Sequence, residues 1–302
     1  MKVISGIGRV KKIERPVVVL GVFDGLHRGH IRILKELTRY AKQVKGKSVV
    51  ITFSPHPQGE LHLYSLGRRI RLFEKIGIDI CVVIRFTPSF ARVSASEFID
   101  NYLIKKIHPY SIFVGKNFTF GKGGRGKPSL LKKYAKRYNV KLKIFPICKI
   151  KGKSISSTYI RRLILTGQLS EAARFLGRPV SILGTVVKGS NLARYLGFPT
   201  ANIKAHHEVL PPAGVYMVRV NLDNKTFNGI CYIGSRPTFK THNAKHIEVH
   251  IFRFNKNIYG RDLEIQFIKK IREERKFKSA RQLTEQIKKD ISLYPFPPLL
   301  RS

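Results

Sequence analysis

The strongest constraint on the fold of this chain is a change of pattern near residue 177. Before it, β-branched runs alternate with amphipathic helical stretches, and after it short apolar runs separated by Gly, Pro and Asn continue until Ala280. Alternating strands and helices predict a parallel sheet covered on both faces. Closely spaced short strands predict an antiparallel barrel. The sequence therefore predicts two domains of different architecture, residues 1–175 and residues 176–302.

The expected elements of the first half are five strands and five helical stretches. The strands are VVVLGV (17–22), SVVITF (48–53), DICVVIRF (79–86), SIFVG (111–115) and KLKIFPI (141–147). The helical stretches are 29–44, 68–77, 94–107, 130–138 and 155–176, and Gly177 and Pro179 end the last of them.

In the second half we expect five strands and a closing helix. The strands are SILGTVV (181–187), GVYMVRVNL (214–222), FNGICYIG (227–234), HIEVHIFRF (246–254) and LEIQFIKKI (263–271), and the helix is SARQLTEQIKKDISLY (279–294).

The bulk composition limits compartment and redox state. No run approaches the roughly 18 apolar residues that a membrane span needs, and the N-terminal residues lack the pattern of a signal peptide. We therefore expect a soluble cytoplasmic protein without a membrane partner. The three cysteines (Cys81, Cys148 and Cys231) form no CxxC pair, which argues against a disulfide framework or a zinc site and favours free buried thiols.

The charge is the outlying property of the sequence. There are 58 Lys and Arg against 18 Asp and Glu, a formal net charge of +40. Such an excess attracts nucleic acid, and it also suits polyphosphate substrates. The basic residues are spread along the chain, and the aromatic signature of an RNA-recognition module is missing. A basic nucleic-acid-binding protein on an old enzyme scaffold is therefore kept only as an alternative.

The first chemical motif is GVFDGLHRGH (21–30), which follows the first predicted strand. His27 and His30 are spaced i, i+3 at the start of a helix, so their side chains share one face. Glycines permit a close backbone approach to a ligand, and a helix N-terminus attracts anions. The motif sits at the carboxyl edge of the predicted sheet, where such sheets bind ligands, although two capping or surface histidines would give the same isolated pattern.

Four segments in order carry a family resemblance across the first half. They are GVFDGLHRGH, TFSPHP (52–57), VGKNFTFGKGGRG (114–126) and ISSTYIRR (155–162). Together they resemble the adenylyltransferase half of bifunctional bacterial riboflavin kinase/FAD synthetases (FMN adenylyltransferases), within the wider HxGH nucleotidyltransferases. The resemblance implies a Rossmann-like α/β nucleotidyltransferase domain that uses ATP and FMN.

The resemblance also implies a set of site residues. His27, His30 and Arg161 would be the catalytic phosphate contacts. ATP would be bound by Gly21, Phe23, Asp24, Gly25, His27, His30, Ser157, Thr158 and Arg161. His56 and Asn117 would contact the flavin, although a turn residue before a strand would look the same as Asn117.

One apparent motif in this half is rejected. Residues 121–127, GKGGRGK, match GxxxxGK, but Pro128 follows where a Walker A loop needs Ser or Thr for magnesium. A mobile basic loop before a helix opened by Pro128 is the better interpretation.

The second half carries a further constellation, in YLGFPTANI (195–203) and IEVHIF (247–252). Pro199 fixes the backbone beside Thr200 and Asn202, whose hydroxyl and carboxamide suit a metal and a phosphate together. This half resembles, in order, the β-barrel riboflavin kinase domain with its C-terminal helix. By that resemblance Thr200 and Asn202 would bind ATP and Mg²⁺, and Glu248 would be the general base for the riboflavin 5′-hydroxyl, unless it simply faces solvent.

Two further residues and four departures complete the sequence-based expectations. Arg272 and Phe277 are expected at the flavin site of the kinase, although a salt-bridged strand end would look the same. Four positions depart from the family pattern, namely Tyr232, Ala193, Arg253 and Asn257. The leading hypothesis is a bifunctional enzyme that converts riboflavin to FMN and FMN to FAD, as a monomer or weak homo-oligomer, and the departures leave open that one activity is lost.

Overall fold

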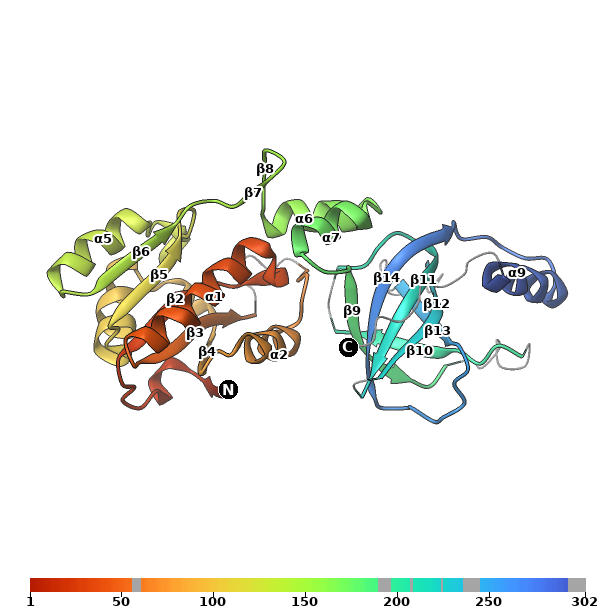
Figure 1. Cartoon of the computed structure of the whole chain (residues 1–302), viewed down its shortest axis with the longest axis horizontal. Helices are drawn as coiled ribbons and strands as arrows, with labels where there is room; N and C mark the ends of the chain where they lie inside the picture. Colours follow the sequence, from red (N-terminus) through yellow and green to blue (C-terminus); the bar gives the residue numbers. More distant parts are fainter. Residues whose placement is uncertain (56–60, 190–196, 207–208, 224, 236–244, 293–302) are drawn as a thin grey trace. The chain divides into compact units, whose positions relative to one another are not determined.

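A computed structural model describes residues 1–55, 61–189, 197–206, 209–223, 225–235 and 245–292. The chain divides into two compact units, Met1–Ser157 and Thr158–Ser302. The units have different architectures, a parallel sheet with helices and a closed barrel (Figure 1). The α/β-then-barrel fold class expected from the sequence is therefore confirmed, while the boundary at residues 175 and 176 remains a prediction.

The first unit is built on a six-stranded sheet in the order β1-β4-β3-β2-β5-β6. Every neighbouring pair in it is parallel. The strands are β1 (Lys2–Ser5), β2 (Pro16–Leu20), β3 (Lys47–Ser54), β4 (Ile80–Arg85), β5 (Ser111–Gly115) and β6 (Lys141–Phe145). The five expected strands are present, and β1 adds an edge strand that the sequence pattern did not predict.

The helical elements of this unit occupy the connections between strands. The α-helices are α1 (Arg28–Gln43), α2 (Leu66–Ile76), α3 (Pro88–Ala91), α4 (Ala95–Glu97) and α5 (Pro128–Arg137). Short 3₁₀ turns are η1 (Ile7–Arg9), η2 (Asp24–Leu26) and η4 (Lys122–Gly124), and η3 (Phe98–Ile107) is a π-helix. A hairpin of β7 (Lys149–Ile150) and β8 (Lys153–Ser154) follows.

Alternation along the strands gives the sheet two apolar faces. Val18 and Leu20 of β2 pack in one cluster with Phe98 and Leu103 of η3. The intervening strand residues face the other side, where α1 packs against β2 and β3. Tyr40 of α1 contacts the ring of Phe113 there, at 5.6 Å between centroids. Helices thus cover both faces, as the alternating pattern predicts.

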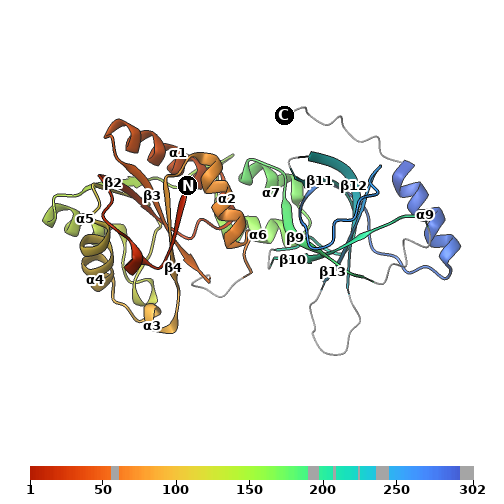
Figure 2. The same cartoon turned by 90° about the horizontal axis from the view of Figure 1, so that it is seen from below.

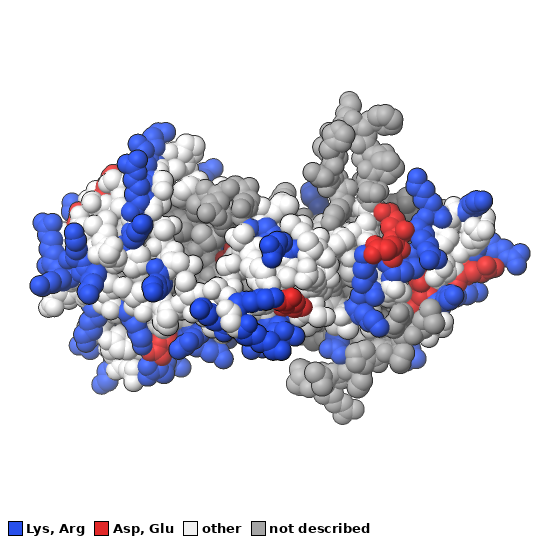
Figure 3. Space-filling model, turned by 90° about the horizontal axis from the view of Figure 1, so that it is seen from above, with Lys and Arg blue, Asp and Glu red and all other residues white. Residues whose placement is uncertain are grey.

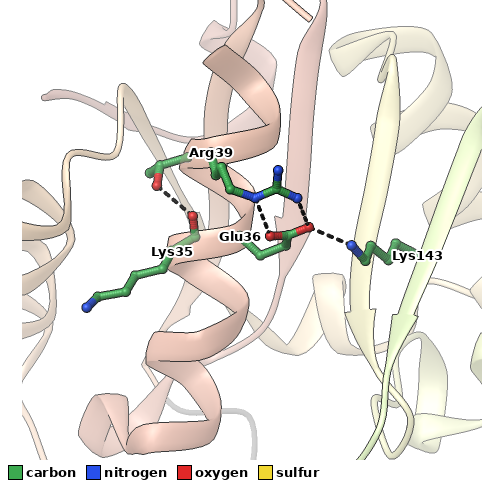
Figure 4. A network of polar contacts seen from close by, with 5 residues as sticks. Lys35, Glu36, Arg39 and Lys143 are labelled. Atoms are coloured by element: carbon green, nitrogen blue, oxygen red, sulfur yellow. Dashed lines mark hydrogen bonds and ion pairs between the residues drawn. The ribbon is translucent and has the colours of Figure 1, made fainter. Parts of the chain in front are cut away.

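A polar network ties α1 to the edge of the sheet (Figure 4). Both carboxylate oxygens of Glu36 accept hydrogen bonds from Arg39, at 2.8 and 2.7 Å, and Lys143 of β6 lies 2.6 Å from one of them. The hydrogen bonds from Arg39 and then Lys143 lower the pKa of Glu36 from its ordinary value of 4.5 to about 2. The carboxylate therefore stays ionised at any physiological pH.

The second unit begins with two helices. They are α6 (Ser157–Leu165), whose first residue still belongs to the first unit, and α7 (Leu169–Leu176). The sequence pattern predicted one helical stretch over 155–176, and this was wrong in one respect. Gly167 lies between α6 and α7 with a φ of 75°, a left-handed conformation that ends an α-helix. Gly177 ends α7 in the same way, with a φ of 80°.

A closed barrel of six antiparallel strands forms the rest of this unit, in the order β10-β13-β12-β11-β14-β9 (Figure 2). The strands are β9 (Ser181–Val187), β10 (Ala201–Ala205), β11 (Gly214–Leu222), β12 (Lys225–Ser235), β13 (Lys245–Ile251) and β14 (Asp262–Arg272), and α9 (Ala280–Ser292) follows. Five of these strands were expected. The sixth, β10, closes the barrel by pairing with both β9 and β13.

One face of the molecule shows how the charged side chains are distributed (Figure 3). On the face shown in Figure 3, Lys and Arg are scattered over the surface of both units, while Asp and Glu gather in a few places. Among the described residues, no helix is long and apolar enough to cross a membrane.

Candidate active sites

The order of the strands places the first site. From β2 the chain proceeds through β3 and β4 toward one side of the sheet, whereas β5 and β6 lie on the other side. The order therefore reverses between β2 and β5, and the crevice outside the carboxyl ends of such a strand pair is where open α/β sheets bind ligands. The turn 21–27 follows β2 and the turn containing Asn117 follows β5, so both candidate segments border this crevice.

The turn after β2 has a tightly specified backbone. Phe23 adopts the left-handed conformation with a φ of 56°, and Gly25 has a φ of 72°. A Cβ at Gly21 would come within 3.0 Å of the Phe23 ring, so a side chain at that position would crowd the ring. The ring in turn lies edge-on to His30, 5.2 Å between centroids. These residues shape the approach to the histidines.

The two histidines lie together at the N-terminus of α1. Their rings stack at 3.6 Å between centroids with an interplanar angle of 17°. His27 is the N-cap residue, and its Nδ1 accepts the backbone N–H of His30 at 3.3 Å. A ring nitrogen that accepts a hydrogen bond carries no proton, so the neutral ring of His27 holds its proton on Nε2 and can donate it to an anion.

Asp24 is buried and has a structural role that the sequence did not reveal. It is 2% exposed, and its carboxylate accepts the backbone N–H groups of Leu63 and Tyr64 at 3.2 and 3.1 Å. Its backbone carbonyl accepts the hydroxyl of Ser157 at 2.9 Å. Ser157, expected from the family motif to bind ATP, thus lies against the turn that precedes His27.

Arg69 is a buried residue of this region that the sequence analysis missed. Its guanidinium donates to the carbonyl oxygens of Val22 and Phe53, at 2.6 and 3.3 Å, and to the hydroxyl of Thr52 at 3.0 Å. Burial lowers its pKa, and the nearby carboxylate of Asp24 opposes that shift. Arg69 therefore joins the carboxyl ends of β2 and β3, which carry the two family motifs.

An aromatic cluster lies at the ends of β3 and β4. Phe53, Phe86 and Phe90 contact one another edge-on or tilted, with centroids 5.8 to 6.2 Å apart.

Asn117 is exposed in the turn after β5, and its Oδ1 would lie 3.3 Å from a Cβ at Gly115. His56 lies outside the described residues. The sequence did not predict the cluster of Phe53, Phe86 and Phe90, because the pattern around each phenylalanine is that of an ordinary core residue.

The rejected P-loop is a closed turn. The backbones of Phe120 and Gly126 exchange hydrogen bonds of 3.1 and 2.8 Å, and Pro128 occupies the first turn of α5. Thr158 and Arg161 stand in α6, within the second unit, so their part in a site with His27 and His30 remains a prediction.

The second site lies on β10 and β13 of the barrel. Asn202 is the register partner of Glu248 across these strands. Thr200 directly precedes β10, and its hydroxyl donates to Oε2 of Glu248 at 3.1 Å. The side chain of Glu248 is only 21% exposed. The three residues expected from the kinase motif are therefore neighbours, and Glu248 is not a freely solvated carboxylate.

Asn202 supplies a buried oxygen that fits a metal site. The residue is 7% exposed, and its Oδ1 has no hydrogen-bond partner within the described part of the chain. A Cβ at Gly189 would lie 1.9 Å from its Nδ2, so only glycine leaves room for this carboxamide. A carboxamide oxygen beside a threonine hydroxyl is a donor set of the kind that Mg²⁺ accepts. No cluster of three His, Cys, Asp or Glu side chains suited to a metal occurs among the residues that the structure describes.

The departures from the family pattern lie in different places. Tyr232 of β12 is the register partner of Glu248, and its hydroxyl donates to Glu274. Arg253 and Asn257 stand in the connection between β13 and β14, where Asn257 accepts the N–H of Tyr259 at 3.1 Å. Ala193 lies outside the described residues. Of the three described departures, Tyr232 is thus the one that adjoins Glu248 across a strand pair.

Arg272 and Phe277 lie at the end of β14 and beyond it. The guanidinium of Arg272 pairs with Asp290 of α9 at 2.9 Å and lies 5.6 Å from the ring centroid of Phe277. Asp290 is 3% exposed, so this ion pair anchors α9 to the barrel. The salt-bridged strand end considered from the sequence is present, and a contact with flavin remains a prediction.

The cysteines are free thiols, and two of them are buried, namely Cys81 and Cys231. Burial raises the pKa of Cys81 to about 12 and also raises that of Cys231. Neither thiol is therefore a nucleophile near neutral pH. Cys148 is partly exposed.

The fold defines a class of protein: an α/β unit of the nucleotidyltransferase type and a closed antiparallel barrel in one chain, each with its own cluster of polar side chains. Comparison with known proteins agrees with this class. The FAD synthetase family model matches residues 10–159, and the riboflavin kinase family model matches residues 176–294. The chain belongs to the bifunctional riboflavin kinase/FMN adenylyltransferase family.

The relatives cover nearly the whole chain. A bifunctional riboflavin kinase/FMN adenylyltransferase of Buchnera aphidicola subsp. Schizaphis graminum is 39% identical over 97% of both chains. That of Listeria monocytogenes is 38% identical over 91% of this chain and 90% of its own. A solved structure, described as a macrolide-efflux protein from Streptococcus pneumoniae, has a TM-score of 0.85 at 31% identity and covers 97% of this chain and 98% of its own. The family expected from the sequence motifs is confirmed.

Proposed function

We propose that this chain carries out both reactions of its family, with the phosphorylation of riboflavin in the barrel and the adenylylation of FMN in the α/β unit. The observation that supports this most strongly is that each unit holds its own constellation. Stacked imidazoles stand at a helix N-terminus in one unit. In the other, a Thr200–Glu248 pair stands beside Asn202, whose Oδ1 has no hydrogen-bond partner among the described residues. A single-activity enzyme needs only one of them.

In the adenylyl transfer, a phosphate oxygen of FMN attacks the α-phosphorus of ATP while the bond to the β-phosphate oxygen breaks and pyrophosphate leaves. No side-chain nucleophile is required, so the protein acts by positioning and by neutralising charge. The backbone N–H groups that begin α1 and the Nε2–H of His27 supply donors for phosphate oxygens. We assign His30 and Ser157 to the same role. Gly21, Phe23 and Gly25 shape the turn, and the carboxylate of Asp24 supports it. Thr158 and Arg161 belong to the second unit, and their contact with ATP stays a prediction from the family motif.

The flavin ring of FMN requires a flat apolar surface. Phe86 and Phe90, which are only partly buried beside the core ring of Phe53, offer apolar ring surface at the carboxyl edge of the same sheet, and aromatic rings favour stacked or edge-on contacts. We place the isoalloxazine against this cluster, with His56 and Asn117 as polar contacts.

In the kinase reaction, the 5′-hydroxyl oxygen of riboflavin attacks the γ-phosphorus of ATP, and ADP leaves. Glu248 accepts the proton of the hydroxyl as the new O–P bond forms. Thr200 and Asn202 would hold Mg²⁺, which neutralises charge on the triphosphate. Arg272 and Phe277 would close the flavin side of this site, with Asp290 holding the guanidinium in place.

The experiment is a mass balance of flavins separated by chromatography, with purified protein, riboflavin, ATP and Mg²⁺ in the reaction. Wild type should yield FMN and FAD. His30→Ala should yield FMN alone, and Glu248→Gln should yield neither from riboflavin but FAD from supplied FMN. If the wild-type protein forms neither product, the proposal fails. No step requires nucleic acid or a membrane, and we place both reactions in the cytoplasm.

A further inference from the structure

Strand β13 presents a row of three polar side chains, His246, Glu248 and His250. They alternate with Ile247 and Val249, which are 2% and 0% exposed in the barrel. Side chains two residues apart lie on the same face of a strand. The row therefore lies on the face of β13 that does not pack into the barrel.

Both ends of this row make contacts that bear on Glu248. Nε2 of His246 lies 2.5 Å from Oε1 of Glu248, and both side chains are 21% exposed. The other carboxylate oxygen, Oε2, accepts the hydroxyl of Thr200 at 3.1 Å. Nδ1 of His250 lies 2.9 Å from the carbonyl oxygen of Pro199, the residue before Thr200. Each oxygen of Glu248 thus has its own protein partner.

A general base must be held in one orientation to be effective. A glutamate side chain has three rotatable bonds, and fixing it costs conformational entropy. One hydrogen bond from Thr200 to Oε2 leaves the carboxylate free to rotate about that contact. A second bond to Oε1 fixes the carboxylate plane, and each carboxylate oxygen still has a lone pair for a substrate hydroxyl.

Among the residues that the structure describes, the other groups near Glu248 do not offer this second contact. Tyr232 faces Glu248 across β12 and β13, but its hydroxyl donates to Glu274. Arg272 is paired with Asp290, and Cys231 is a buried thiol. Among the described residues, His246 is the side chain that contacts Oε1.

We propose that His246 is a positioning residue of the kinase half, which donates Nε2–H to Oε1 of Glu248 and orients this carboxylate toward the riboflavin 5′-hydroxyl. The inference rests on the proposed kinase function. As the 5′-oxygen bonds to the γ-phosphorus and the bond from that phosphorus to the ADP oxygen breaks, the hydroxyl proton passes to Glu248. His246 takes no part in bond making and acts only through the orientation of the base.

Two substitutions separate this role from simple packing. His246→Gln keeps an N–H donor at a similar reach, and His246→Leu keeps apolar bulk without a donor. We expect His246→Leu to lower the kinase kcat by about 10- to 100-fold, the size of effect that a misplaced reacting group produces. The KM values for riboflavin and ATP should stay within about twofold, because the residue does not contact either substrate. His246→Gln should retain most of the activity.

A matched control comes from another histidine of the barrel. His206 contacts the hydroxyl of Thr185 at 2.8 Å and a carboxylate oxygen of Asp262 at 3.5 Å, so it too pairs with an acid. His206→Leu should leave the kinase kcat within about twofold of wild type. FAD formation from supplied FMN, measured in the same preparations, checks the first unit, and a thermal melt checks the barrel.

The outcomes separate the inference from the proposed function. An unchanged kcat in His246→Leu, an equal loss in His246→Leu and His246→Gln, or a loss confined to KM would overturn the positioning role. If His246→Leu does not fold, His246→Asn replaces it in the comparison. The amide of Asn is too short to reach Oε1, so His246→Asn should lose kcat while His246→Gln keeps it. A wild type without kinase activity, or an active Glu248→Gln, would instead refute the proposed function.

Discussion

The buried carboxylate of Asp24 gives the sharpest quantitative prediction, because the family motif and the structure assign it different roles. The motif implies a contact with ATP, whereas the structure commits both oxygens to the backbone N–H groups of Leu63 and Tyr64. The change Asp24→Asn preserves the shape of the side chain. It replaces one acceptor oxygen by an NH₂ group that faces a donor.

The size of the effect follows from these two bonds. A hydrogen bond to a charged group contributes about 1.5–3 kcal/mol, and a buried donor left unpaired costs about 1–3 kcal/mol. Because one oxygen is lost and one N–H is orphaned, we expect the free energy of unfolding of the first unit to fall by about 3 kcal/mol. For a unit of this size that corresponds to a decrease in Tm of about 6–12 °C.

Calorimetry of the full-length protein measures the stability and the Tm of the first unit. Hydrogen exchange at the amides of Leu63 and Tyr64 reports whether the two local hydrogen bonds are intact. Both amides should exchange faster in Asp24→Asn. The control is Asp100→Asn, which replaces the carboxylate that accepts the Tyr138 hydroxyl at the surface by a neutral carboxamide and should change stability by less than about 1 kcal/mol. An unchanged Tm with unchanged amide exchange, together with a rise of about tenfold in KM for ATP, would refute the structural role.

Three further outcomes follow from the described contacts. Glu36→Gln should lower stability by about 0.5–1 kcal/mol at neutral pH. The pKa of Glu36 is lowered to about 2 in the folded protein, so its contribution to stability is present above pH 4.5 and is lost as the pH falls toward 2. The difference in Tm between wild type and Glu36→Gln should therefore shrink in acid. A difference that stays constant with pH would contradict this. Iodoacetamide at pH 8 should modify Cys148 before the buried thiols Cys81 and Cys231, as read by peptide mass spectrometry, and the reverse order would contradict their raised pKa values. Tyr232→Phe should destabilise the barrel by about 1–3 kcal/mol in a thermal melt, because its carboxylate partner loses a donor, and an unchanged melt would show that this contact contributes nothing.

The large features of the fold were predictable because they depend on local periodicity. The strand–helix alternation predicted the parallel sheet, and the short strands predicted the barrel. Strand β1 was missed because only Ile4 of its four residues is buried, so it carries no alternating pattern. Strand β10 was missed because Pro199 precedes it and reads as a turn signal. The break at Gly167 was missed because a single glycine inside an apolar helical pattern does not show which conformation it adopts.

The candidate sites were predictable only where a motif named the residues. The spacing of His27 and His30 predicted that they share a face, and their rings do stack. Arg69 is buried because it donates to the carbonyl oxygens of Val22, in the turn after β2, and of Phe53 in β3. These partners are distant in sequence, so the sequence pattern of its helix predicts a solvent-exposed arginine. The contact between His246 and Glu248 likewise depends on side-chain geometry that strand alternation alone does not give.

The central claim is that two separate sites, one in each unit, bind nucleotide. A crystal structure of the full chain with Mg²⁺ and a non-hydrolysable ATP analogue tests it most directly. We expect one triphosphate at the N-terminus of α1 beside His27 and His30, and a second beside Thr200 and Asn202 with its γ-phosphate toward Glu248. Analogue bound at saturation in neither place, or in only one of them, would contradict it.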